Sequence, residues 1–251
     1  MTRLLFSLLF LALSFKGFAA EPTIYVRLAK YVPSVLIEVK GEFRIYNPVT
    51  GALIATEWKN KRETARPSSK GIIFGDLFPG IHKMQIIPNH PNGSFLVNGI
   101  QYNGMLEIEQ IEGALHIINR VDAENYIRSI LTTHFPERKE SALTDALAII
   151  SRTQAYYLIA HQGEVSWHVE ADQVGYNGCS TFLHNPKIDC SVIETRGQIL
   201  MRQQRPFSAT WDRQGTSGLS LQQAAEMARK GNKSGAILKT FFPGARVEKI
   251  Q

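Results

Sequence analysis

Residues Ser141 to Gln162 read SALTDALAIISRTQAYYLIAHQ and carry the longest helical pattern in the chain. Their leucine and isoleucine side chains recur at three- and four-residue spacing, which predicts one apolar helix face. The alanines among them permit close packing, and Gly163 follows as a stop signal. The sequence therefore predicts a long helix at the centre of the core.

A shorter helix is predicted just before it. Asp122 has a side chain suited to an N-cap, and the acidic Glu124 follows in the first turn. The apolar side chains from Tyr126 to Leu131 form one stripe. Pro136 ends the helix, because proline disfavours helical geometry in the residue before it.

The flanking sequence predicts strands. Upstream, apolar and polar residues alternate in Thr23–Lys30, Ser34–Lys40, Glu42–Tyr46, Lys83–Ile87, Phe95–Val97 and a hairpin of Met105–Glu109 with Ala114–Ile118. The charged stretch Lys59–Lys70 predicts an exposed loop. Downstream, Gly197–Met201 and Pro206–Trp211 predict a second hairpin, and Ser220 with Gln223 predicts the start of another helix. The expected class is α+β, a strand-rich body around a long central helix.

Composition excludes several classes of protein. The chain has 251 residues, 44% of them hydrophobic, and a formal net charge of +6. These values exclude a disordered or fibrous chain. The mild basic excess does not by itself indicate nucleic-acid binding, so we expect no nucleic-acid partner. No phosphate-binding loop or dinucleotide fingerprint is present, and we expect no cofactor.

The N-terminus has the layout of a secretory signal peptide. Arg3 precedes an apolar run from Leu4 to Leu13, and small residues surround Ala19. Lys16 cuts the run short of the roughly 20 residues that span a membrane. We expect residues 1–20 to be a signal peptide cleaved near Ala19, which sends the protein to the periplasm or outside the cell. Membrane contact is then expected only through the uncleaved signal segment.

Residues 21–251 are expected to form a single domain, with a strand-rich part at 21–120 and a helix-containing part at 121–251. Export predicts a disulfide between Cys179 and Cys190, because an oxidising compartment favours disulfide formation. The alternative is a metal site that combines the two thiolates with His168 and His184. Because these residues are irregularly spaced, we predict the disulfide and no metal.

Three blocks of sequence occur in the order found in a known family. They are 97–104 (VNGIQYNG) with 118–119 (IN) and 124–127 (ENYI); 145–156 (DALAIISRTQAY); and 194–200 (ETRGQIL) with 222–231 (QQAAEMARKG) and 237–244 (ILKTFFPG). Over roughly residues 24–244 the chain resembles the stage II sporulation protein D and LytB amidase-enhancer family. This resemblance implies an exported peptidoglycan protein. Some members are lytic transglycosylases acting on glycan strands stripped of their peptides, and others enhance a cell-wall amidase.

The chain departs from the family at the catalytic acid. The family has a glutamate ten residues after the one that Glu124 matches, but here that position is His134. The family's Gly-His-Gly stretch is replaced by 215–218 (GTSG). Histidine titrates near pH 6.5 and can move protons. However, a cationic imidazolium would stand where positive charge develops on the sugar and raise the barrier. Glu137 and Glu140 are candidate substitutes.

The resemblance also suggests residues that hold the sugar. The candidates are Arg152 and Tyr156 on the long helix, with Gln173 and Tyr176 in the following loop. Each has a structural alternative: Arg152 can instead pair with Asp145 or Glu124, and a loop tyrosine can simply pack. His134 can equally serve the carbonyl end of its helix. Trp167 and Trp211 are ambiguous in the same way.

Two main hypotheses stay open. In the first, the protein is a lytic transglycosylase that cleaves peptidoglycan glycan strands with His134, Glu137 or Glu140. In the second, it is a non-catalytic module that binds glycan or a cell-wall amidase partner. A third is an exported scaffold without sugar binding.

Overall fold

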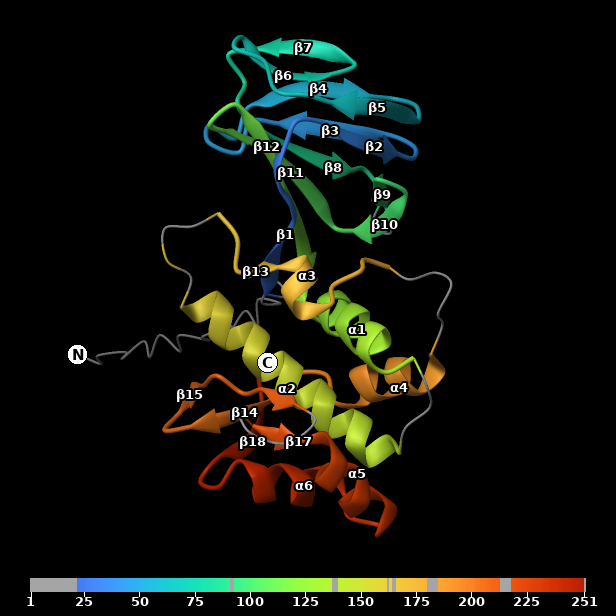
Figure 1. The fold of residues 1–251 in the computed structure, drawn as a ribbon, viewed down its shortest axis with the longest axis vertical. Coiled ribbons are helices and arrows are strands. Elements are labelled where there is room, and N and C mark those ends of the chain that lie inside the picture. Colours follow the sequence, from blue (N-terminus) through green and yellow to red (C-terminus); the bar gives the residue numbers. More distant parts are fainter. Residues whose placement is uncertain are drawn as a thin grey trace, which may run out of the picture.

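The computed structural model describes residues 22–90, 93–136, 140–161, 163, 166–179, 185–212 and 218–250. The predicted signal peptide therefore lies outside the described residues. The strands of the first half gather at one end of the molecule, and the helices gather at the other (Figure 1). The predicted α+β class is confirmed. The division into one domain stays a prediction.

The largest sheet has seven strands and connects the two ends of the molecule. Strands β1 and β12 extend toward α1 and α3, as Figure 1 shows. In sheet order the strands are β13 (Val169–Glu170), β1 (Thr23–Val32), β12 (Ala114–Asp122), β11 (Met105–Ile111), β8 (Lys83–Pro88), β3 (Phe43–Tyr46) and β4 (Leu53–Glu57). The predicted hairpin is confirmed, because β11 pairs with β12 from Met105–Arg120 to Ile111–Ala114.

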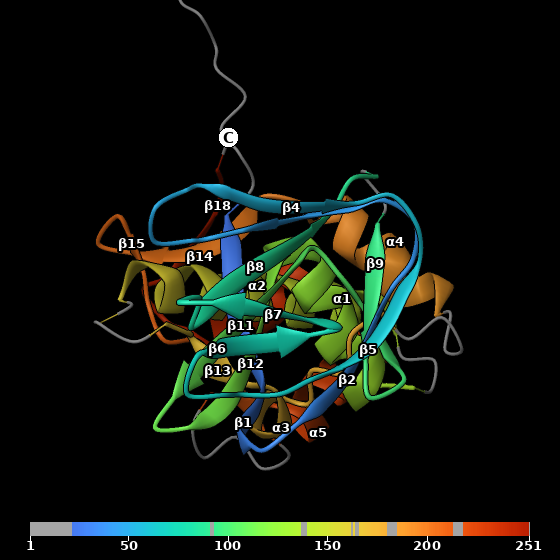
Figure 2. The ribbon, with the colours of Figure 1, turned by 90° about the horizontal axis from the view of Figure 1, so that it is seen from above.

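A second sheet completes the strand-rich end. Its strands are β10 (Ile100–Asn103), β9 (Ser94–Val97), β2 (Val35–Val39) and β5 (Lys61–Ala65). The ribbon β6 (Gly71–Phe74) with β7 (Asp76–Pro79) lies across the top of this end (Figure 2). Alternate apolar side chains such as Ile37, Phe95 and Ile45 are fully buried in the core of this end.

The predicted loop at Lys59–Lys70 is wrong. Residues Lys61–Ala65 form β5, which pairs antiparallel with β2 at the edge of its sheet. Edge strands commonly carry charged side chains, because one side of the strand faces solvent. The middle three residues of β5 are exposed, and Ala65 is buried. Charge alone was therefore a poor guide to a loop.

The helical end is built around the long predicted helix. α2 (Ser141–Ala160) packs against four other helices, namely α1 (Ala123–His134), α4 (Pro186–Glu194), α5 (Leu221–Arg229) and α6 (Ser234–Phe241). It also packs against strands, chiefly β14 (Gln198–Arg202). Its alanines Ala146, Ala148 and Ala155 are fully buried, which confirms the close packing expected from the sequence. No helix among the described residues has the length and apolarity needed to cross a membrane.

The second predicted hairpin is shorter than expected. β14 pairs with β15 (Arg205–Pro206) through a turn in which Gln203 and Gln204 have positive φ. β18 (Arg246–Lys249) pairs on the other side of β14. The predicted second strand stops at Pro206, and β16 (Trp211–Asp212) pairs instead with β17 (Leu219–Ser220).

A polar cluster lies on the face of the large sheet opposite the core. Arg27 forms an ion pair with Glu170 and lies 3.6 Å from the centre of the Trp167 ring. Its Nη1 donates to Nδ1 of the buried His116 at 3.1 Å. An arginine can only donate, so this nitrogen of His116 accepts and the imidazole is neutral. Burial, followed by the charge of Arg27, lowers the pKa of His116.

These contacts predict a loss of stability in mild acid. Burial also lowers the pKa of His168, whose Nδ1 accepts the Tyr25 N–H. The unfolded chain, with histidine pKa values of about 6.5, therefore binds more protons than the folded chain below that pH. The free energy of unfolding is expected to have its highest value above about pH 6.5. It should fall as the pH drops from there through the histidine pKa values of the folded protein. Guanidinium denaturation between about pH 7.5 and 5.5 measures this.

His116→Gln should remove part of that pH dependence, because glutamine does not titrate. The matched control is His161→Gln at the exposed end of α2, which should leave the pH dependence as in the parent. Equal unfolding free energies at both ends of the pH range in the parent protein would contradict the prediction.

Candidate functional site

The helix α1 carries the candidate catalytic position at its last residue. Its N-cap is Asp122, as predicted, with a side chain that accepts the Asn125 N–H at 2.9 Å. The helix ends at His134, and Phe135 leaves the helical conformation directly before Pro136. The cap and the proline thus fix both ends of α1, and His134 is the last residue of the helix.

Arg152 is a structural residue, which corrects its predicted role in sugar binding. Its guanidinium is fully buried and forms a bidentate ion pair with Glu124 at 2.7 and 2.8 Å. Its remaining donors reach backbone carbonyls at 2.9–3.2 Å, namely those of Val192, Thr195 and Gln198. All five N–H groups are used, so none is left for a ligand.

Tyr176 is also a core residue and not a sugar platform. Its ring is 5% exposed and lies 5.7 Å from the Tyr126 ring and 5.8 Å from the Tyr102 ring, centre to centre. Its hydroxyl donates to Asn119 Oδ1 at 2.5 Å. Burial raises its pKa well above the usual tyrosine value. The side chain therefore fastens the loop after α3 (Ala171–Val174) to the sheet.

His134 is exposed and is held against this loop. Its Nε2 lies 3.0 Å from the carbonyl oxygen of Val174, to which it donates when it carries the proton. A Cβ on Gly175 would lie 2.7 Å from the same nitrogen, and Gly175 has a φ of +67°. The positive φ favours glycine there, and a Cβ would also displace the His134 ring. With Nε2 committed, Nδ1 is the nitrogen left to exchange a proton with a ligand.

Trp211 completes the surroundings of His134. Its ring is half-buried, meets the His134 ring edge-on at 4.9 Å and lies 5.2 Å from Phe135, all between centres. The sequence leaves Trp211 ambiguous, because it is distant in sequence from His134 and no local pattern places the two rings together. An exposed imidazole beside an indole is a pair that can hold a sugar ring by stacking and hydrogen bonding. We call this pair the His134–Trp211 site.

The other predicted site residues lie in different settings. Gln173 is exposed on α3, in the turn that holds His134. Glu140 precedes α2 and forms an ion pair with Arg229 of α5 at 3.5 Å. Tyr156 is half-buried, and its pKa is raised by burial and then by the charge of Glu124. Glu137 lies outside the described residues.

The predicted disulfide is not formed. Both cysteines are free. The Cys179 N–H donates to the Gln101 carbonyl at 2.7 Å, which holds this residue against β10, and burial raises the pKa of its thiol to about 11. Cys190 lies on the exposed side of α4. Within the described part of the chain, no group of three or more His, Cys, Asp or Glu side chains could hold a metal ion.

Comparison with known proteins gives one family match. Residues 111–201 match the model of the stage II sporulation protein family SpoIID. The chain is 32% identical over 160 residues to an uncharacterised protein of Chlamydia pneumoniae, covering 63% of this chain and 58% of the relative. It is 30% identical over 161 residues to one of Chlamydia muridarum, covering 63% and 56%. A protein of Brachyspira hyodysenteriae is 24% identical over 190 residues, covering 74% and 50%. The chain thus spans about half the length of these curated relatives.

The ion pair between Glu124 and Arg152 predicts a large loss of stability when it is broken. Glu124→Gln leaves the guanidinium buried without a counter-charge, so the free energy of unfolding should fall by about 3–5 kcal/mol. Glu38→Gln is the matched control, because Glu38 pairs with the exposed Arg62 at 3.8 Å. That surface pair should contribute at most about 1 kcal/mol. Guanidinium denaturation measures both, and equal losses would contradict the structural role of Arg152.

Proposed function

We propose that this protein, whose residues 111–201 match the stage II sporulation protein family SpoIID, binds peptidoglycan glycan strands at the His134–Trp211 site. The family connects the chain with the cell wall. The signal-peptide pattern at residues 1–20 supports an extracytoplasmic location, in the periplasm or outside the cell. Glycan binding at this site is the proposal that the geometry supports best.

The observation that carries the proposal is the contact between His134 and Trp211. The two rings lie 4.9 Å apart at the end of α1. The sequence resemblance aligns this position with the family's catalytic acid. A half-buried indole offers an apolar face to a pyranose ring, and an imidazole offers a hydrogen-bonding group to its hydroxyl or acetamido substituents. Gln173 adds an exposed amide on the neighbouring α3. These groups suit a polar, ring-shaped ligand such as a sugar.

Binding without cleavage is favoured over cleavage by the chemistry of His134. Protonation of the glycosidic oxygen needs an acid, and the positive charge that develops on the sugar is stabilised by a carboxylate. Imidazolium supplies the proton but adds a like charge. Glu140, one predicted substitute, is paired with Arg229. The non-catalytic reading also allows a role as partner of a cell-wall amidase.

Cleavage is the second candidate, and it is favoured by Nδ1 of His134, which has no hydrogen-bond partner among the described residues. Imidazolium would donate the Nδ1 proton to the glycosidic oxygen while the bond from that oxygen to the anomeric carbon breaks. The sugar's own 6-hydroxyl would then attack the anomeric carbon and return its proton to Nδ1. The products are an anhydro sugar end and a new free hydroxyl, and no water is consumed. One nitrogen would thus perform both proton transfers.

Glycan binding is tested by co-sedimentation of the full chain with sacculi stripped of stem peptides. Trp211→Ala should weaken binding roughly tenfold, which corresponds to about 1.4 kcal/mol of lost stacking. Trp58→Ala is the matched control, because Trp58 is 76% exposed at the strand-rich end. It should bind as the parent does. No sedimentation of the parent, or equal losses in both variants, would refute the proposal.

Cleavage is tested by measuring release of anhydro-muropeptides from the same sacculi. His134→Gln retains an amide that can donate to the Val174 carbonyl but cannot transfer protons. If the protein binds without cutting, the parent should release no product, and the variant should still sediment. If the parent does release product and His134→Gln lowers the rate by on the order of 100-fold or more, the protein is a transglycosylase and the binding-only reading is wrong.

A further inference from the structure

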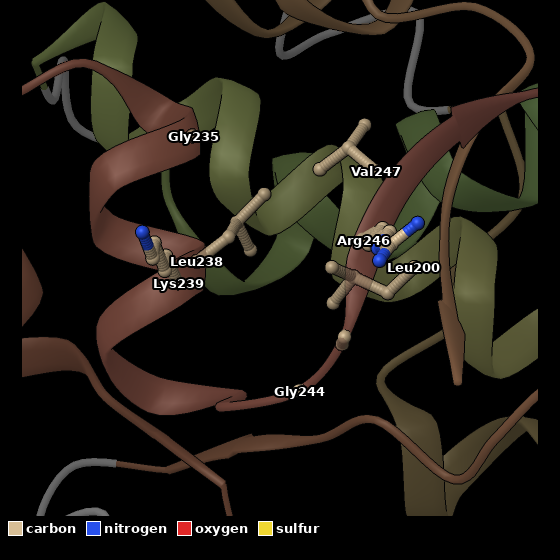
Figure 3. Close-up of a pocket in the computed structure, with 8 residues that line it drawn as sticks. Leu200, Gly235, Leu238, Lys239, Gly244, Arg246 and Val247 are labelled. Carbon is tan, nitrogen blue, oxygen red and sulfur yellow. The ribbon is translucent and has the colours of Figure 1, made fainter. Parts of the chain in front are cut away.

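An open cavity of about 480 Å³ lies between α6, β14 and β18, at the helical end of the molecule (Figure 3). Its apolar lining comes from Leu200, Leu238 and Val247. Leu238 and Lys239 project from α6 on one side, and Leu200 and Val247 lie on the other, as Figure 3 shows. None of the residues that line the cavity belongs to the His134–Trp211 site. We call this cavity with the adjoining edge of β18 the α6–β18 groove.

No strand of the described residues pairs with the outer edge of the strand next to the cavity. β18 is an outer strand of its sheet, with β14 on its inner side. The Ile250 N–H donates to the Gly197 carbonyl at 2.9 Å, which fixes the phase of the hydrogen bonds. Because bonding groups alternate along an antiparallel strand, the N–H and C=O groups of Val247 and Lys249 point to the open edge. Such an edge can accept another strand.

The surroundings of the groove are basic. Residues 196–251 contain ten lysines and arginines but three acidic residues, a net charge of +7 against +6 for the whole chain. Two of these cations, Lys239 and Arg246, line the cavity and are exposed, and Lys249 lies farther along β18. Neither lining cation forms an ion pair with a described residue. The groove therefore combines an apolar hollow, an open strand edge and exposed cations that outnumber the one acidic residue of β18, Glu248.

We propose that the α6–β18 groove binds an extended, acidic segment of a partner protein, which adds as a strand to β18. Strand addition obtains affinity from backbone hydrogen bonds and specificity from alternate side chains that enter pockets. Here an apolar side chain of the partner enters the cavity, and acidic neighbours meet Lys239, Arg246 and Lys249. A lipid surface cannot pair with the strand edge, and a glycan has no peptide backbone to do so. The proposal does not depend on glycan binding at the other site.

The first test uses a labelled synthetic peptide of alternating glutamate and valine, with binding to the full chain followed by fluorescence anisotropy. Gly235 lies in α6, lines the cavity, and a Cβ built on it meets nothing within 4 Å. Gly235→Leu should therefore fill the cavity without disturbing the helix and weaken binding roughly tenfold or more. Gly235→Ala, the matched control, should bind within about twofold of the parent.

Two further measurements separate strand addition from simple charge attraction. The double variant Lys239→Glu with Arg246→Glu should bind the peptide at least roughly tenfold more weakly than Lys230→Glu with Lys233→Glu, which has the same net charge outside the cavity. A peptide methylated on alternate backbone nitrogens should not bind the parent protein, because it lacks the N–H groups needed to pair with β18. This result does not depend on how the variants bind.

Three outcomes overturn the proposal. They are no binding of the glutamate–valine peptide, equal binding of its methylated form, and equal or tighter binding of polyglutamate or of phosphatidylglycerol vesicles. The last outcome would identify the region as a general anion-binding surface.

Discussion

The ion pair between Arg152 and Glu124 holds the helical end of the molecule together. A fully buried guanidinium is costly unless every donor is satisfied, and here a carboxylate from α1 and carbonyls from the end of α4 to the start of β14 satisfy all of them. Three elements, α1, α4 and β14, thus converge on one side chain of α2. Any packing that separated one of them would leave a buried charge without its partners.

This constraint also fixes the candidate site. Because Glu124 lies in the first turn of α1, its ion pair sets the position of that helix, and the helix carries His134 at its other end. The loop after α3 is fastened independently by the hydroxyl of Tyr176 to Asn119. His134 therefore meets the Val174 carbonyl and Trp211 between two anchored elements. Arg152 and Tyr176, which the sequence predicts as sugar ligands, instead fix the positions of α1 and of the loop after α3, the two elements beside His134.

Local patterns in the sequence predicted most of the fold. The cap at Asp122, the period of α2 and the β11–β12 hairpin were predicted correctly, since each depends on residues close in the chain. The charges of Lys61–Ala65 predict a loop, but they suit an exposed edge strand equally well, which is what these residues form. The helix α4 was missed altogether.

The candidate site was harder to predict than the fold. The position of His134 followed from the spacing after Glu124, but the roles of Arg152 and Tyr176 depend on burial by partners 28 to 57 residues away. No local pattern reports such contacts. Trp211 is recognisable in the sequence as an aromatic residue, but its contact with His134 joins positions far apart in the chain.

The most direct test is hydrogen–deuterium exchange of the full chain with and without glycan strands stripped of their peptides. Glycan bound at the end of α1 should slow the exchange of backbone amides at 131–135 and 171–178 and leave those of β2 and β5 unchanged. Protection spread evenly over both ends of the molecule, or no protection beside His134, would contradict the account.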